Sequence, residues 1–196
     1  SWAVPVADRI GDVRIPRFDP THPLFAEYQA KLEQLLGAWS WETFLPSHGT
    51  MLGPADILSG LLGPQQLACE LCEHPEEVRR CALDAAVFVA GVIEHELGLL
   101  RDAGFVEGTP GSFEVWLPGR GVLLSEDFTA LIGPRHYQDV FAEADAYVYG
   151  RLDSVQLHVH SAALPCLDAL MAVPGLGAIE ISTDPRGPDL AARLAA

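Results

Sequence analysis

Residues 121–182 read GVLLSEDFTALIGPRHYQDVFAEADAYVYGRLDSVQLHVHSAALPCLDALMAVPGLGAIEIS, and this stretch decides the fold class. It contains three short apolar segments, at 121–124, 154–158 and 178–182, separated by helical patterns. Short segments rich in Val, Leu and Ile are typical of buried strands, and strands that alternate with helices indicate parallel βα units. A fourth strand is predicted at 41–45, where WETFL is aromatic and β-branched. We therefore expect an α/β fold with parallel strands.

Helical patterns fill most of the remaining chain. The longest predicted helix runs from Pro75 to about Asp102, because Glu76 and Glu77 occupy its first turn and apolar residues then recur at helical spacing. Further helices are predicted at 24–36, 55–62, 64–72, 134–146, 165–171 and 188–195. A chain of 196 residues is one domain's worth, so we expect a single domain over residues 1–196.

The charge balance excludes several classes of partner. The chain has 27 acidic and 12 basic side chains, a net charge of −15, and Lys31 is its only lysine. Nucleic-acid binders carry basic patches, so neither nucleic acid nor an anionic membrane surface is expected as a partner. The longest apolar run, Ala85–Ile93, is far shorter than the ~20 residues of a membrane-spanning helix. With four scattered cysteines and no signal-like start, the sequence favours a cytoplasmic protein that acts on a small molecule.

Polar and ionisable residues follow the predicted strands, and the carboxyl ends of parallel strands are where α/β proteins build their sites. His158 and His160 are two residues apart, so on a strand both imidazoles face the same side. Neutral imidazole is a good ligand for zinc and related metals. We therefore predict that His158 and His160 bind a metal, with Asp127, Glu180 or Cys166 as further ligands. The alternative is that the histidines only pack or form hydrogen bonds.

Three stretches of the sequence resemble the uroporphyrinogen decarboxylase superfamily, which includes cobalamin-dependent methyltransferases. The first is LGPADIL…LG followed by EHPEEV, residues 52–63 and 73–78, and the second is LSEDF…IGPRHY, residues 124–137. The third is HVHS…LDAL…PGLGAI, residues 158–179, which is similar to the family's "H-x-D-G" or "H-x-C-G" strand end and the segment after it. Together they cover roughly residues 40 to 185.

The resemblance implies a (β/α)₈ TIM-type barrel with its site at the carboxyl-end mouth. Such a barrel takes ~250 residues, so we expect a partial barrel that lacks several βα units. The strand near residue 180 would then expose apolar residues, and the chain would self-associate or pair with a missing barrel half. The residues expected at the mouth are the catalytic group Asp127, His158 and His160, with Glu126, His48, Glu180 and Asp184 in contact with the substrate.

The function that the resemblance implies is that of the methyltransferase-like branch, which acts on a small methylated substrate or a corrinoid. In that branch a His-x-Cys strand end holds zinc, and the corrinoid would come from a partner protein. This chain has His160 at the position of that cysteine. Two alternatives stay open. One alternative is a porphyrinogen-type decarboxylase that needs no metal, and the other is a non-catalytic, truncated binding or remnant protein.

Overall fold

Four parallel strands form the main sheet in the computed structural model, which describes residues 4–40, 42–46, 51–111 and 115–185. The strands β1 (Met51–Leu52), β4 (Gly121–Ser125), β5 (Ser154–His160) and β6 (Ala178–Ser182) lie in that order across the sheet. Their register aligns Ser125 with His158 and His158 with Glu180. The predicted α/β class, and the parallel strands at 121–124, 154–158 and 178–182, are therefore confirmed.

The strand predicted at 41–45 is wrong. The described residues there form a turn with one isolated antiparallel bridge, between Ser40 and Phe44. The Thr43 hydroxyl accepts a hydrogen bond from the Ser40 amide (3.0 Å), and the Thr43 amide donates to the Ser40 carbonyl (3.0 Å). Local bonds of this kind satisfy the backbone without a neighbouring strand. The first strand of the sheet is instead the two-residue segment β1.

The predicted helices are present with small differences in their bounds. They are α1 (Pro23–Ala38), α2 (Pro54–Leu62), α3 (Pro64–Glu73), α4 (Pro75–Asp102), α5 (Pro134–His136), α6 (Ala142–Tyr149) and α7 (Leu167–Met171). A π-helical turn at Tyr137–Phe141 joins α5 to α6, and 3₁₀ segments cover Ile10–Asp12, Asp127–Leu131 and Ser161–Cys166. The helix predicted at 188–195 lies outside the described residues. None of the described helices has the length and apolar composition needed to cross a bilayer.

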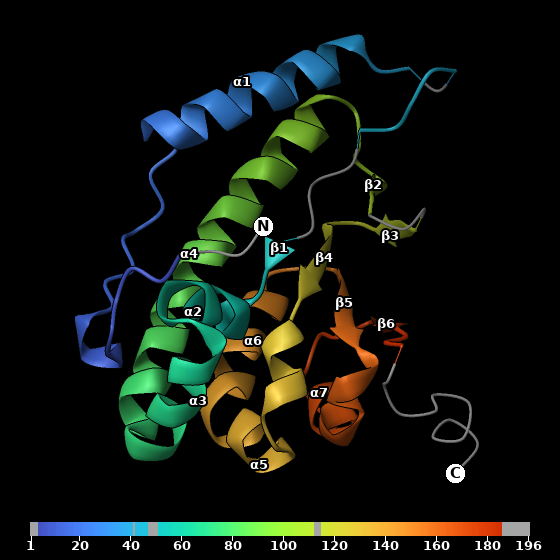
Figure 1. The fold of residues 1–196 in the computed structure, drawn as a ribbon. Helices are drawn as coiled ribbons and strands as arrows, with labels where there is room; N and C mark the ends of the chain where they lie inside the picture. Colours follow the sequence, from blue (N-terminus) through green and yellow to red (C-terminus); the bar gives the residue numbers. More distant parts are fainter. Residues whose placement is uncertain (1–3, 41, 47–50, 112–114, 186–196) are drawn as a thin grey trace.

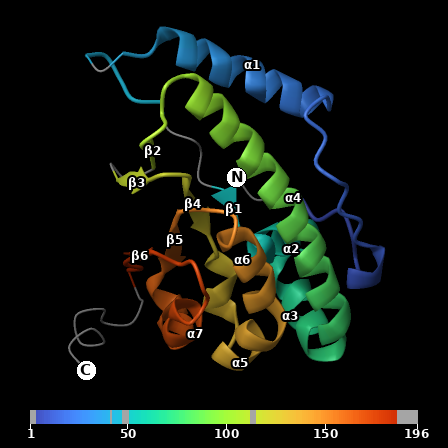
Figure 2. The ribbon, with the colours of Figure 1, turned by 180° about the vertical axis from the view of Figure 1, so that it is seen from behind.

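Helices cover one face of the sheet. Helix α6 lies behind the sheet in Figure 1 and in front of it in the reverse view of Figure 2. Helix α1 lies along α4 at the periphery (Figures 1 and 2), where the Phe25 ring is 5.4 Å from the ring of His95. An antiparallel hairpin that the sequence analysis missed, β2 (Gly108–Pro110) and β3 (Trp116–Pro118), precedes β4.

Side chains along the sheet alternate between two faces, and this alternation positions the site. The residues that pack against the helices and belong to the hydrophobic core are Val122, Leu124, Val155, Leu157 and Val159. His158 and His160 alternate with these residues and so lie on the opposite face, here named the histidine face. Ser125, which is in register with His158, lies on the same face.

Strand β6 forms one edge of the sheet among the described residues. Ala178 is exposed, and the rest of the strand is half-buried. An apolar cavity of about 340 Å³ lies beside it, lined in part by Met171, Ile179 and Ile181. Accessible apolar residues were expected near residue 180, and they are present. The described part of the chain forms an open sheet, and it does not close into a barrel.

Candidate metal centre

The candidate site lies at the carboxyl ends of β4, β5 and β6. His158 and His160 are near the end of β5, and Asp127 follows β4 by two residues. Glu180 belongs to β6, and Asp184 follows that strand. Consecutive parallel strands bring these five residues together, as expected from the position of sites in α/β folds.

Asp127, His158 and His160 converge on one point. The Asp127 Oδ1 atom lies 3.8 Å from Nε2 of His158 and 3.8 Å from Nε2 of His160. All three candidate ligand atoms lie within 4.8 Å of one another. Two ligands of a tetrahedral zinc ion with bonds of ~2.1 Å are roughly 3.4 Å apart, so small side-chain rotations bring these atoms to coordination distance. The residues therefore fit one divalent ion.

Each histidine is held by a carboxylate through its other ring nitrogen. Nδ1 of His158 is hydrogen-bonded to Oε2 of Glu180, and Nδ1 of His160 is 2.7 Å from Oδ1 of Asp184. A carboxylate at Nδ1 keeps the proton on that nitrogen and leaves the Nε2 lone pair available for a metal. Histidine ligands of metals almost always have such a partner. Both Nε2 atoms are thus oriented toward Asp127.

Asp184 is itself fixed by the residues that follow β5. The Ser161 hydroxyl donates to Asp184 Oδ2 (3.1 Å), and the Asp184 amide donates to the Ser161 oxygen (3.1 Å). The hydrogen bond with His160 lowers the pKa of Asp184, and the same bond raises the pKa of His160. Asp184 therefore stays ionised, and it favours a protonated His160 when no metal is bound.

A buried aspartate of α2, which the sequence analysis did not identify, holds the loop that carries Asp127. Asp56 Oδ2 accepts hydrogen bonds from the Ser125 hydroxyl (2.7 Å) and the Asp127 amide (3.0 Å), and Oδ1 accepts one from the Phe128 amide (2.8 Å). Because Asp56 is in the first turn of a helix, sequence alone gives it the ordinary role of an acidic residue at a helix N-terminus. Its contacts with residues about 70 positions away are visible only in the fold.

Glu126 lies in the interior, and this contradicts the expectation that it contacts the substrate. Its side chain is fully buried, and Oε1 accepts a weak hydrogen bond from the Ala55 amide (3.4 Å). Burial, and then the neighbouring Asp145 carboxyl, raise the pKa of Glu126. Side chains along 125–127 alternate between faces, so Glu126 points toward the helices and Asp127 toward the histidine face.

Asp145 on α6 completes this buried acidic pair. The Tyr137 hydroxyl donates a hydrogen bond to Asp145 Oδ2. Burial raises the pKa of Asp145 to about 7, and burial also raises the pKa of Glu126. Without a proton between them, two carboxylates in this apolar setting would repel each other.

A pocket of about 480 Å³ opens beside the candidate metal centre. The residues that line it come from α2, from the segment after β4 and from the ends of the neighbouring strands, and they are Leu52, Asp56, Ser59, Gly60, Gly63, Pro64, Asp127, Phe128, Ala130, Leu131, His160, Ala162 and Asp184. Asp127 and His160 thus face both the proposed ion and the pocket. Among the other predicted residues, Cys166 is buried, and its thiol contacts the Ile132 carbonyl (3.3 Å). His48 lies outside the described residues.

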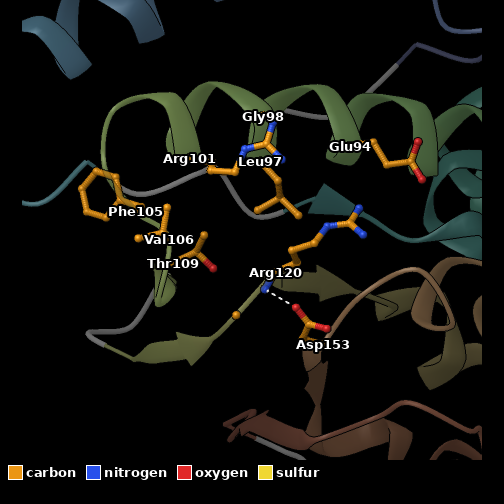
Figure 3. A pocket seen from close by; sticks show the side chains of 10 residues that line it. Glu94, Leu97, Gly98, Arg101, Phe105, Val106, Thr109, Arg120 and Asp153 are labelled. Carbon is orange, nitrogen blue, oxygen red and sulfur yellow. Dashed lines mark hydrogen bonds between the residues drawn. The ribbon is translucent and has the colours of Figure 1, made fainter.

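A second cavity, of about 240 Å³, lies at the opposite ends of the strands (Figure 3). Arg120 and Asp153, which line it, immediately precede β4 and β5, and the Arg120 amide donates to Asp153 Oδ2 (2.8 Å). Arg101 and Glu94 of α4 also line it, so both signs of charge are present. Because this cavity is away from the carboxyl ends, and because the described residues that line it include no converging metal ligands, the histidine face is the better candidate site.

Comparison with known proteins adds no assignment. No family model, no curated protein and no solved structure matches the chain. The resemblance to the uroporphyrinogen decarboxylase superfamily therefore stays a prediction from the motifs, and the function must be argued from the site.

Proposed function

We propose that this protein is a metal-dependent enzyme in which Asp127, His158 and His160 hold one divalent ion, with zinc as the first candidate. One observation carries the proposal. Both histidines have a carboxylate at Nδ1, and both turn Nε2 toward the same Asp127 oxygen. Three protein ligands with a position left for a substrate or water are typical of catalytic zinc sites.

The proposed reaction is methyl transfer from a methylated donor to a thiol, as in the methyltransferase-like branch. The thiol gives up its proton, its sulfur bonds the methyl carbon, and the demethylated donor leaves with the electron pair of the bond that held the methyl group. A bound zinc ion would supply Lewis acidity, which favours the thiolate form of a thiol substrate. The protein's own residues hold the ligands in position. Glu180 and Asp184 keep the Nδ1 protons in place, and Asp56 fixes the backbone of Asp127.

The sheet supports the finer proposal that this is part of a (β/α)₈ barrel. Its strands are parallel and follow one another across the sheet in chain order, with helices on one face. A doubly wound sheet would instead reverse its order at a switch point. In the proposed barrel, the histidine face is the inner face.

The pocket favours this reading over porphyrinogen decarboxylation. A porphyrinogen carries several carboxylates, which basic side chains would have to bind. None of the described residues that line the pocket is lysine or arginine, whereas three are aspartates. The third alternative, a non-catalytic remnant, is separated by the experiment that follows.

Metal binding to the purified, metal-free chain tests the proposal. We expect titration calorimetry to show one zinc ion per chain, and replacement of His158 or His160 by alanine to weaken zinc affinity by at least about 100-fold. Asp184→Asn should weaken it by roughly 10–100-fold. His136→Ala is the matched control, since His136 is an exposed histidine of α5, and it should bind zinc like the unchanged chain.

Circular dichroism must show that each variant stays folded. Ferrous iron should be titrated in parallel, because two histidines and one carboxylate also form iron sites. A folded chain that binds neither metal above the level of the His158→Ala variant would overturn the proposal and leave the remnant reading.

A further inference from the structure

The pocket beside the metal centre is acidic. Asp56, Asp127 and Asp184 contribute carboxyl groups to its wall, and no lysine or arginine is among the described residues that line it. Glu180 adds a fourth carboxyl group through its contact with His158. A divalent ion held by Asp127 would offset two of these four formal negative charges and leave two. The electrostatic potential there favours positive ligands.

The mouth of the same pocket is apolar. Leu52 at the end of β1 and Leu131 at the end of the 3₁₀ segment are 52% and 59% exposed. Both line the pocket, together with Phe128 and Ala130. Large apolar side chains gain stability when a ligand covers them. The volume of about 480 Å³ is in the range of small-molecule sites.

We infer that the pocket receives a small organic cation, with its positive group toward Asp184 and its apolar body on Leu52 and Leu131. The inference rests on the proposed function, since it names the substrate class of that same site. It follows from the combination of the acidic wall and the apolar mouth of the pocket. A phosphorylated or carboxylate-rich molecule of the same size would place its charges against the acidic wall of Asp56 and Asp184.

Three probes with the same butyl chain test this inference: butyltrimethylammonium, butanol and butanesulfonate. None is a strong zinc ligand, so their binding reports on the pocket. On the zinc-loaded protein, titration calorimetry should show the ammonium probe binding about tenfold or more tighter than the sulfonate, with butanol between them. The preference should shrink as the salt concentration rises.

A charge placed at the mouth should reverse the preference. Leu131→Arg should favour the sulfonate, whereas Leu131→Gln should keep the preference for the cation. Met171→Arg is the distant control, because Met171 is 56% exposed and lines the other apolar cavity, beside β6. It should leave the order of the three probes unchanged.

The outcomes separate the two proposals. A protein that binds zinc but takes the three probes equally, or prefers the sulfonate, overturns the inference and leaves the metal centre intact. A protein that binds no zinc but still prefers the ammonium probe overturns only the metal centre. An ammonium probe that binds only when zinc is removed is occupying the ligand position itself, and that result also overturns the inference.

Discussion

Replacing Gly53 with alanine should destabilise the protein strongly, because a buried carboxyl group occupies the space that a methyl group needs. A Cβ atom at Gly53 would lie 2.5 Å from Cδ and 2.9 Å from Cγ of Glu126, and closer still to Oε1. The backbone at Gly53 is an ordinary extended one, with φ of −73°, so the penalty is purely steric.

Both backbones are held by hydrogen bonds, and the Glu126 side chain is enclosed in the core, so it can shift only by displacing its neighbours. Glu126 is fully buried, its amide donates to the His158 carbonyl (3.1 Å), and the Gly53 amide donates to the Ser125 carbonyl (2.8 Å). Overpacking a well-packed core costs about 1–3 kcal/mol and occasionally more. Since these separations are well inside van der Waals contact, we expect a loss of about 3 kcal/mol in the free energy of unfolding.

Urea denaturation followed by circular dichroism measures this loss. Gly98→Ala in α4 is the matched control, since nothing lies within 4 Å of its Cβ position, and alanine there should stabilise the helix by up to about 1 kcal/mol. The two variants should therefore shift the urea midpoint in opposite directions. In a Glu126→Ala background, the cost of Gly53→Ala should largely disappear. An unchanged midpoint for Gly53→Ala would refute the placement of Glu126 beneath Gly53.

Four further predictions concern the buried acids and the site. Burial raises the pKa of Asp145 from 3.8 to about 7, so between these pH values the folded state holds a proton that the unfolded state releases. The free energy of unfolding therefore falls as the pH rises from about 4 to 7, by up to ~1.4 kcal/mol per pH unit from this group. Asp145→Asn should flatten that fall in urea midpoints measured from pH 5 to 8, and parallel profiles would contradict it. Tyr137→Phe removes the hydroxyl donor to Asp145 and should cost about 1–3 kcal/mol at pH 8, whereas an unchanged midpoint would show that the bond is not formed. Asp56→Asn places an amide donor against backbone N–H groups, so it should lower stability by about 1–3 kcal/mol and weaken zinc binding, and zinc affinity equal to that of the unchanged chain would contradict the role of Asp56. Because Asp184 raises the pKa of His160, zinc affinity should decline as the pH falls through that pKa, by about tenfold per pH unit for one displaced proton, and titrations at several pH values check this.

The sheet and the histidine pair could be predicted because they depend on local patterns. Short apolar segments marked β4, β5 and β6, and the spacing of His158 and His160 placed both rings on one face. The same alternation places the adjacent residues Glu126 and Asp127 on opposite faces of the sheet. The sequence therefore contained the signal that only one of them faces the site.

The remaining features depend on contacts between distant residues. Asp56 supports Asp127 across about 70 residues, and Asp145 meets Glu126 only because α6 packs behind β4. At 42–45, strand-forming residues turn back because Ser40 and Thr43 satisfy each other's hydrogen bonds. Strand β1 has two residues and no pattern that could identify it.

In the proposed metal centre, the ligands and the carboxylates that hold them come from different strands, and this affects how mutation can change the site. The proposed ligands come from β5 and the residues after β4, whereas Glu180 and Asp184, which hold the Nδ1 atoms of the histidines, come from β6 and the residues after it. A change of carboxylate to amide on β6 alters ligand strength while every coordinating atom stays in place. If the proposed centre holds a metal, its preference and reactivity can thus be retuned by mutating the edge strand of the sheet, most of which is only half-buried.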